Sequence, residues 1–195
     1  MSNLLQQLNA EMSDVLENVR ASLVEIHNSH RGIGAGIVWS ADGVIITNAH
    51  VVGRSHLQVT LPDGRTLPAR VLAHDADHDL AALAVDATGL PAIQVGQSQH
   101  LHPGQWVMAL GHPWGVTGAA TSGIVIGAGS EWPEMPQSGR EWVVVSLHLR
   151  PGYSGGPLVD AQGRLVGVNT MMTGPDVGVA VPVHIVQDFM RRAKT

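Results

Sequence analysis

The stretch Gly152-Tyr153-Ser154-Gly155-Gly156-Pro157 places a serine among glycines, directly after an extended apolar run and before Leu158-Val159. Small neighbours allow a sharp backbone turn and the close approach of a substrate carbonyl. A serine hydroxyl is a weak nucleophile unless a positioned base activates it. The stretch therefore indicates nucleophilic chemistry only if the same chain also supplies a histidine and a carboxylate.

Two upstream segments supply these groups. His50 lies in Thr47-Asn48-Ala49-His50-Val51-Val52, and Asp79 lies in His78-Asp79-Leu80-Ala81-Ala82-Leu83. Taken alone, a serine between glycines is usually a turn, and an aspartate before an apolar strand is often a cap or turn residue. Together, in the order His, Asp, Ser, the segments resemble those of the chymotrypsin-like (trypsin-fold) serine peptidases, and more closely those of the HtrA/Deg branch.

Scaffold segments in the matching order extend this resemblance over roughly residues 20 to 192. They are Gly34-Ala35-Gly36-Ile37-Val38, Asp42-Gly43-Val44-Ile45-Ile46-Thr47, Leu110-Gly111-His112-Pro113-Trp114-Gly115, Thr121-Ser122-Gly123-Ile124-Val125 and Leu165-Val166-Gly167-Val168-Asn169-Thr170. One glycine-flanked serine would be weak support, whereas three active-site segments and these scaffold segments are specific. The resemblance implies an all-β chymotrypsin-like fold: two six-stranded antiparallel β-barrels with an N-terminal and a C-terminal helix.

The residue pattern agrees with that architecture. Apolar residues near the N-terminus recur at spacings of three and four, which predicts an amphipathic helix within residues 1–21. Short β-type runs separated by turn signals such as Asp42-Gly43 follow. We expect one trypsin-like domain over residues 1–195, with a first barrel over 22–97, a second over 104–182 and a C-terminal helix over 183–195.

The composition narrows the class of partner. The chain has 195 residues, a net charge of −5, 44% hydrophobic residues and 14% charged residues, which is typical of a globular domain with a sizeable core. No basic run is available to pair with phosphates, so a nucleic-acid partner is not expected. No apolar stretch is long enough to span a membrane. Without cysteine, the fold must be held by core packing rather than by disulfides.

The resemblance assigns a role to each residue of the triad. His50 would act as the general base, Asp79 would hold the other ring nitrogen, and Ser154 would attack a peptide carbonyl and carry the acyl group. The backbone N–H groups of Gly152 and Ser154 would form the oxyanion hole. The separations of 29 and 75 residues put His50 and Asp79 in one barrel and Ser154 in the other. The expected partners are polypeptide substrates, cleaved internally.

The walls of a substrate pocket are also expected near the serine. His148 and Leu149 precede the oxyanion turn, and Asn169, Thr170 and Met171 follow the next strand. None of these is an acid suited to a Lys/Arg-selective pocket, so we expect small or medium apolar side chains before the cleaved bond. His148 keeps an acidic or polar preference open.

The oxyanion turn departs from the family pattern at two positions. The HtrA branch usually has Arg-Gly-Asn-Ser-Gly-Gly here, whereas this chain has Pro151 before Gly152 and Tyr153 after it. Proline fixes its own φ and lacks an N–H, so it could preset the turn in an active or an inactive shape. The alternative to an active peptidase is therefore a catalytically silent binding or scaffolding module on the same fold.

Other patterns give weaker indications. Among eleven histidines, His74 and His78 lie four apart with aspartates beside them, but the segment is predicted as a turn entering a strand, so neither a metal nor a cofactor is expected. The N-terminal helix either docks on the barrels or makes a homo-oligomer contact, as in related trimeric proteases. No export signal is visible, which favours the cytoplasm; a periplasmic or secreted location stays open if a leader has been removed.

Overall fold

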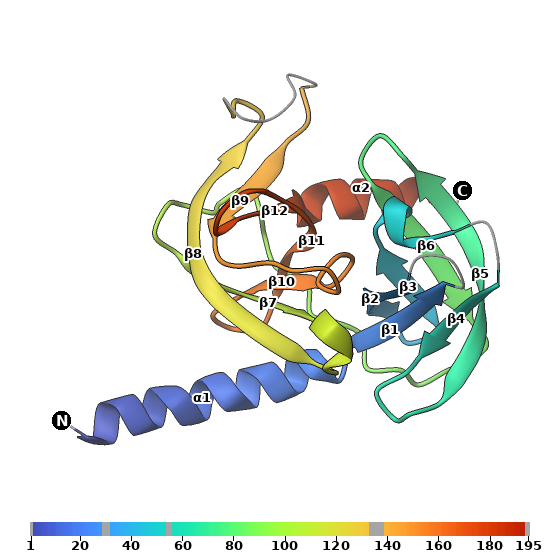
Figure 1. Cartoon of the computed structure of the whole chain (residues 1–195), viewed down its shortest axis with the longest axis horizontal. Coiled ribbons are helices and arrows are strands. Elements are labelled where there is room, and N and C mark those ends of the chain that lie inside the picture. Colours follow the sequence, from blue (N-terminus) through green and yellow to red (C-terminus); the bar gives the residue numbers. More distant parts are fainter. Residues whose placement is uncertain (1, 29–31, 54–55, 133–138, 194–195) are drawn as a thin grey trace.

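Two closed six-stranded antiparallel barrels make up most of the molecule (Figure 1). The computed structural model describes residues 2–28, 32–53, 56–132 and 139–193. The predicted all-β double barrel is confirmed, and so are helices at both ends of the chain. Residues 1, 194 and 195 of the two predicted helical segments lie outside the described residues.

The first barrel has the strand order β1-β2-β3-β6-β5-β4. Its strands are β1 (Leu23–Asn28), β2 (Gly32–Ser40), β3 (Val44–Thr47), β4 (Leu57–Thr60), β5 (Thr66–Asp75) and β6 (Leu80–Val85). The turn between β2 and β3 uses Gly43 at φ +93°, a conformation in which glycine avoids the strain of a side chain. Val24, Ile26, Ile45 and Leu83 are fully buried inside this barrel.

The second barrel has the order β10-β11-β12-β9-β8-β7. Its strands are β7 (Trp106–Gly111), β8 (Ala119–Gly129), β9 (Trp142–Ser146), β10 (Pro157–Asp160), β11 (Leu165–Gly174) and β12 (Val177–Pro182). Valine dominates β9 and β12, and such β-branched side chains favour strands. A further apolar cluster joins the two barrels; it includes Ile37 and Ile46 from the first and Leu110 and Val168 from the second.

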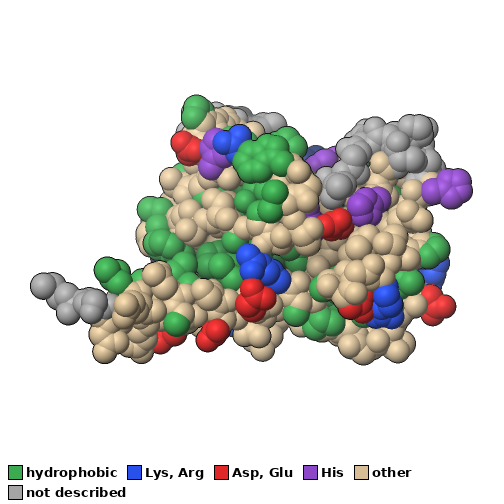
Figure 2. Space-filling model, turned by 60° about the horizontal axis from the view of Figure 1, so that its bottom comes forward, with side chains coloured by type: hydrophobic (Ala, Val, Ile, Leu, Met, Phe, Trp, Pro, Cys, Tyr) green, Lys and Arg blue, Asp and Glu red, His purple; other side chains and the backbone are tan. Residues whose placement is uncertain are grey.

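Helix α1 (Ser2–Arg20) packs on the second barrel with only part of its length (Figure 1). Val15 and Val19 join the cluster between the barrels, whereas Leu4, Leu5 and Leu8 are 74%, 66% and 49% exposed. Figure 2 shows hydrophobic side chains gathered on the surface beside this helix. The helix therefore has an apolar stripe that the barrels cover incompletely.

Helix α2 (Val183–Ala193) contacts both barrels, with β11 and β12 on one side and β5 and β6 on the other. Its buried face consists of Val183, Val186, Phe189 and Met190. Arg191 and Arg192 lie in its last turn, where their positive charge interacts favourably with the negative end of the helix dipole. None of the described helices is long and apolar enough to cross a membrane.

Two strands continue past irregularities in their pairing. Strand β5 has a bulge between Val71 and Ala73 and keeps pairing with β6 as far as Asp75. Strand β11 continues to Gly174 past two similar irregularities. The first extension shortens the turn that leads to Asp79, and the second places Met171 and Met172 in a β-strand.

Candidate active site

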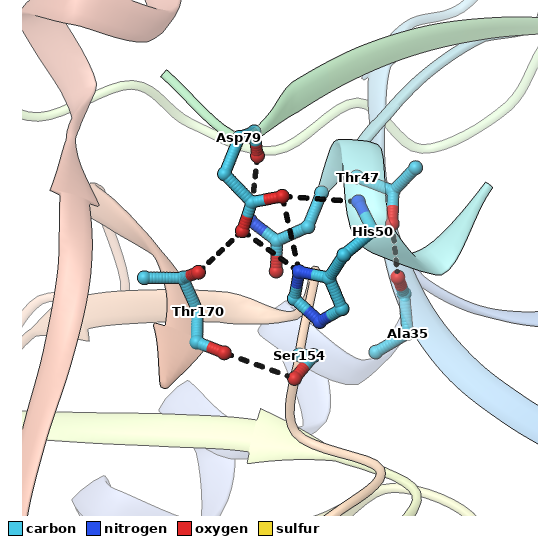
Figure 3. A network of polar contacts seen from close by, with 7 residues as sticks. Ala35, Thr47, His50, Asp79, Ser154 and Thr170 are labelled. Atoms are coloured by element: carbon cyan, nitrogen blue, oxygen red, sulfur yellow. Dashed lines mark hydrogen bonds and ion pairs between the residues drawn. The ribbon is translucent and has the colours of Figure 1, made fainter. Parts of the chain in front are cut away.

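His50 and Asp79 meet at the edge of the first barrel (Figure 3). His50 lies in the 3-10 turn η1 (Ala49–Val51), directly after β3. Its ring Nδ1 is 2.8 Å from Oδ2 of Asp79, and its backbone N–H donates to Oδ1 at 3.0 Å. Because a carboxylate can only accept, Nδ1 carries the proton in this pair. The other ring nitrogen, Nε2, lies on the side of the ring that faces Ser154 (Figure 3).

Asp79 is held from three directions. The Asn48 side-chain amide donates to its backbone carbonyl at 3.0 Å, and the Thr170 hydroxyl from β11 donates to its carboxylate. Burial opposes ionisation, but the hydrogen bonds from His50 and Thr170 outweigh it, so the pKa of Asp79 lies below its usual value. The backbone has φ +54°, a left-handed conformation that is uncommon for a residue with a side chain.

The turn before Asp79 is organised by Asp75. Its Oδ1 accepts the N–H groups of Asp77 and His78 at 3.0 Å, and its Oδ2 is 2.9 Å from Nδ1 of His78. Arg192 of α2 reaches the same oxygen at 3.3 Å. Asp75 therefore couples the Asp79 turn to the C-terminal helix.

Ser154 comes from the second barrel but is fixed to the first. Its backbone carbonyl accepts the N–H of Ala35 at 3.0 Å, and the Ala35 carbonyl accepts the hydroxyl of Thr47 at 2.7 Å. The Ser154 hydroxyl donates to the backbone carbonyl of Thr170 at 3.1 Å. Figure 3 shows the Ser154 side chain beside the His50 ring. The structure thus brings His50, Asp79 and Ser154 together, with the hydroxyl turned toward Thr170.

The turn before Ser154 requires glycine at position 152. Gly152 has φ +106°, and a Cβ there would lie 2.6 Å from the carbonyl oxygen of His112. The Gly152 carbonyl accepts the His112 N–H at 2.9 Å, and the Tyr153 N–H donates to the Arg150 carbonyl at 3.1 Å. Within the described chain, no acceptor takes the N–H of Gly152 or of Ser154. Both predicted oxyanion donors therefore have no hydrogen-bond acceptor among the described residues.

A pocket of about 270 Å³ opens beside Ser154. Leu149, Arg150, Pro151, Tyr153, Ser154, Thr170, Met171 and Met172 line it. Of the predicted wall residues, Leu149, Thr170 and Met171 are present. Tyr153, Arg150 and Met172 were not expected there, because the sequence does not disclose how the oxyanion turn and β11 face each other.

His148 and Asn169 are not among the residues that line this pocket. The ring of His148 contacts the carboxylate of Asp176 in the turn between β11 and β12. Asn169 is fully buried, and its amide donates to the Pro157 carbonyl of β10 at 2.9 Å. Asn169 thus braces β10 against β11.

The described residues contain no group of three or more His, Asp or Glu side chains positioned to hold a metal ion. His78, one of the spaced histidine pair, is instead bonded to Asp75. The segment around His74 lies at the end of β5 rather than in a turn.

Two six-stranded barrels with a histidine, an aspartate and a serine at their junction define the class of trypsin-fold proteins. Comparison with known proteins agrees: residues 34–168 match the family model described as "Trypsin-like peptidase domain". The chain belongs to the trypsin-like peptidase family and is HtrA/Deg-like within it.

Individual relatives and a solved structure similar to this chain are also HtrA- or DegP-type proteases. "Serine protease HTRA2, mitochondrial" of Drosophila pseudoobscura pseudoobscura is 37% identical over 82% of this chain and 39% of its own length. "Probable periplasmic serine endoprotease DegP-like" of Halomonas elongata is 37% identical over 81% of this chain and 34% of its own length. The solved structure "HtrA-type protease AlgW with tripeptide" superposes with a TM-score of 0.85 at 29% identity, covering 92% of this chain and 62% of that one. The chain spans well under half of the curated relatives' length.

Proposed function

We propose that the protein is a serine endopeptidase that uses His50, Asp79 and Ser154 as a catalytic triad. The observation that carries this proposal is the pairing of His50 Nδ1 with the Asp79 carboxylate at 2.8 Å. Beside this pair, two N–H groups of the Ser154 turn have no acceptor among the described residues. A carboxylate on Nδ1 fixes the ring tautomer, so that Nε2 can accept a proton. Membership of the trypsin-like peptidase family supports the same chemistry.

In the proposed reaction, Nε2 of His50 takes the hydroxyl proton as Oγ of Ser154 forms a bond to the peptide carbonyl carbon. The carbonyl electron pair moves onto oxygen, where the N–H groups of Gly152 and Ser154 stabilise it. When the tetrahedral species collapses, the C–N bond breaks and His50 returns the proton to the leaving amine. Water, activated by His50, then releases the acyl group.

The alternative of a catalytically silent binding module is not favoured. That alternative requires an oxyanion turn whose N–H groups are blocked or satisfied by the protein itself. Pro151 is exposed and precedes a turn with Gly152 at φ +106°, and neither predicted donor has a described acceptor. The apolar pocket of Leu149, Met171 and Met172 is consistent with small or medium apolar residues before the cleaved bond.

Covalent labelling tests the proposal directly. A fluorophosphonate should modify the protein at Ser154, and casein should be cleaved by the same preparation. Ser154→Ala should abolish labelling and lower kcat by at least about 10⁴-fold, because the triad acts as a unit. Ser13→Ala, which alters an exposed serine of α1, is the matched control and should keep both. Labelling that persists in Ser154→Ala would reject the assignment.

We also propose that α1 makes the contact of a homo-oligomer, a trimer by similarity to related proteases. Leu4, Leu5 and Leu8 expose apolar surface, and a groove between the helix and the second barrel is lined by Leu8, Met12, Trp106 and Met108. Large exposed apolar patches often mark association sites. Light scattering should give three copies for the unmodified chain and one for a Leu5→Glu, Leu8→Glu variant; a monomer for both would reject the contact.

For cellular location, we propose the periplasm. The curated name of the Halomonas relative places that protein there, and the expectation of a cytoplasmic protein receives no support from the relatives. Fractionation of cells that express the complete natural gene tests this proposal. Recovery in the cytoplasmic fraction would overturn it.

A further inference from the structure

Among the described residues that line the pocket beside Ser154, Arg150 is the one with a charged side chain. The other lining residues are apolar, hydroxyl-bearing or aromatic, and Arg150 is exposed to solvent. It lies four residues before Ser154, in the segment that forms the oxyanion turn, and its backbone carbonyl accepts the N–H of Tyr153. Its position is therefore fixed relative to the scissile bond of any substrate held by that turn.

Arg150 differs from most other arginines of this chain in having no acidic partner. Six arginines of the described chain pair with a carboxylate: Arg20, Arg65, Arg140, Arg164, Arg191 and Arg192. No ion pair or side-chain hydrogen bond involves Arg150 or Arg70 among the described residues, and Arg70 lies in β5, away from the pocket. A guanidinium has five N–H donors that match a carboxylate in two-point geometry. At the pocket these donors are left for a ligand.

Trp114 holds the guanidinium in place. The Cζ atom of Arg150 lies 4.8 Å from the centre of the Trp114 ring, within the range of a cation–π contact. Trp114 is 76% exposed and has φ +56°, so a large apolar side chain is kept in water on a strained backbone. Such strain is concentrated at ligand clamps and active sites. This contact uses none of the guanidinium N–H donors in a hydrogen bond to a described residue.

The neighbouring backbone ties this pair to the catalytic turn. A Cβ at Gly152 would meet Pro113 Cα at 2.8 Å, so the segment that carries Trp114 packs directly against the predicted oxyanion glycine. Burial raises the pKa of the Tyr153 hydroxyl, and the positive charge of Arg150 partly opposes that rise. Arg150 thus acts electrostatically on a residue that lines the pocket.

We propose that Arg150, stacked on Trp114, forms a cationic subsite that selects peptides bearing a carboxylate close to the cleaved bond. The apolar pocket walls take the side chain before the bond, and the guanidinium edge pairs with the carboxylate of a flanking residue. The preferred substrates are therefore segments in which an apolar residue has an acidic neighbour. This inference rests on the proposed peptidase function, because it uses the same pocket.

The carboxylate has two possible sources, an Asp or Glu side chain or the C-terminus of a peptide. Quenched fluorogenic peptides that share one apolar cleavage residue distinguish them. One series exchanges Gln for Glu singly at the three positions on each side of the bond. A second series compares a free C-terminal acid with the amide. We expect kcat/KM to rise about fivefold for Glu over Gln at one flanking position, the size of a single exposed charge pair, and to lose most of this ratio in 0.5 M NaCl.

The decisive measurement is the ratio of kcat/KM for the Glu peptide to kcat/KM for the Gln peptide, determined for each variant. Arg150→Gln should bring the ratio to about one, and Arg150→Glu should invert it in favour of Gln over Glu. Trp114→Ala should reduce the ratio by releasing the guanidinium. Arg70→Glu, at the other arginine without an acidic partner among the described residues, is the matched control and should keep the unmodified ratio.

Failure of this inference is distinguishable from failure of the peptidase proposal. If the peptides are cleaved but the ratio is about one at every position and at both termini, or is unchanged in Arg150→Glu, the cationic subsite is rejected and the peptidase stands. If no peptide is cleaved and Ser154 is not labelled, the peptidase proposal falls. The subsite is then tested by fluorescence anisotropy of the same peptides on Ser154→Ala, where equal binding of the Glu and Gln forms rejects it.

Discussion

Thr170 and Ser154 are joined by a 3.1 Å hydrogen bond in which the serine hydroxyl donates to the threonine carbonyl. The hydroxyl of the same threonine donates to Asp79, so one residue of β11 contacts both ends of the proposed triad. In this state the Ser154 hydroxyl donates its proton to Thr170, so this hydrogen bond must be exchanged for one to His50 before proton transfer. Catalytic hydrogen bonds of unliganded enzymes often tighten only when substrate binds.

Replacing the Thr170 hydroxyl should weaken catalysis through Asp79. Thr170→Val keeps the shape of this buried side chain but leaves the carboxylate with one donor fewer. We expect kcat/KM to fall about tenfold, since a hydrogen bond to a charged group contributes about 1.5–3 kcal/mol. Thr170→Ser retains a hydroxyl and should recover most of the rate. Equal activity of Thr170→Val and the unmodified protein would mean that His50 and Asn48 orient Asp79 without the Thr170 hydroxyl.

Asp75 should act on the rate through the turn that carries Asp79. Asp75→Ala removes the acceptor of two backbone N–H groups and the partner of His78, so the left-handed Asp79 loses its support. We expect a roughly tenfold lower kcat with little change in KM, and about 1–3 kcal/mol less stability. Asp63→Ala is the control, because Asp63 organises a similar turn with Arg65 in the β4–β5 hairpin. It should leave kcat intact.

The direction of the pKa shift of Asp75 determines how this residue makes stability depend on pH. Burial opposes ionisation, but the contacts with His78 and Arg192 lower its pKa below the usual 3.8. A lowered folded-state pKa stabilises the fold above pH 3.8, and this stabilisation is lost as the pH falls through the lower folded value. Urea unfolding at a series of acidic pH values should therefore show a flatter acid limb for Asp75→Asn than for the unmodified chain.

Sequence patterns indicated those features of the molecule that depend on residues close together in the chain. His50, Asp79 and Ser154 stand in short contiguous motifs, and the short β-type runs separated by turns agree with the strands that the structure shows. The second role of Thr170 depends instead on where β11 lies relative to the β5–β6 turn. Nothing in the sequence next to Thr170 indicates its hydrogen bond to Asp79, because the two residues are 91 positions apart.

The predicted pocket had a similar limit. His148 and Asp176 are 28 residues apart, and their contact depends on how the β11–β12 turn folds back onto the end of β9. Asn169 was expected at the pocket wall, but the register of β10 with β11 places its amide on the Pro157 carbonyl. Register and bulges are set by whole-barrel packing. A single sequence therefore indicates which loops form the pocket better than which side chains enter it.

His112 should make stability depend on pH near neutrality. It is 2% exposed; its Nε2 donates to the Val24 carbonyl at 3.1 Å, and its Nδ1 accepts the Gly118 N–H at 3.3 Å. Burial lowers the pKa of this ring, and the nearby Glu25 offsets the effect only in part, while His27 adds to it. The folded state therefore holds the ring neutral at pH values where the unfolded chain already binds a proton.

The sign of the His112 effect is testable. Above pH 6.5 both states are neutral and the ring contributes nothing; below 6.5 the unfolded state gains the proton first, so stability falls by at most about 1.4 kcal/mol per pH unit. Chemical unfolding between pH 8 and 5 should show this decline, and His112→Asn should reduce it. His100→Asn changes an exposed histidine and should leave the decline in place. A slope that His112→Asn does not alter would assign the effect to other groups.

Alanine variants at Gly152 and Gly64 distinguish the effect of backbone strain from that of crowding at the oxyanion turn. Both have positive φ, +106° and +86°, so alanine at either position costs roughly 1–2 kcal/mol of conformational strain. Only at Gly152 would the new Cβ meet backbone atoms, at 2.6 Å, whereas nothing lies within 4 Å at Gly64. Gly152→Ala must therefore shift the turn and its N–H groups, and we expect kcat to fall by about 10²-fold or more, the effect of losing one oxyanion donor. Gly64→Ala should lower the melting temperature and keep kcat. Similar activity losses in both variants would show that strain, rather than displacement of the turn, limits the enzyme.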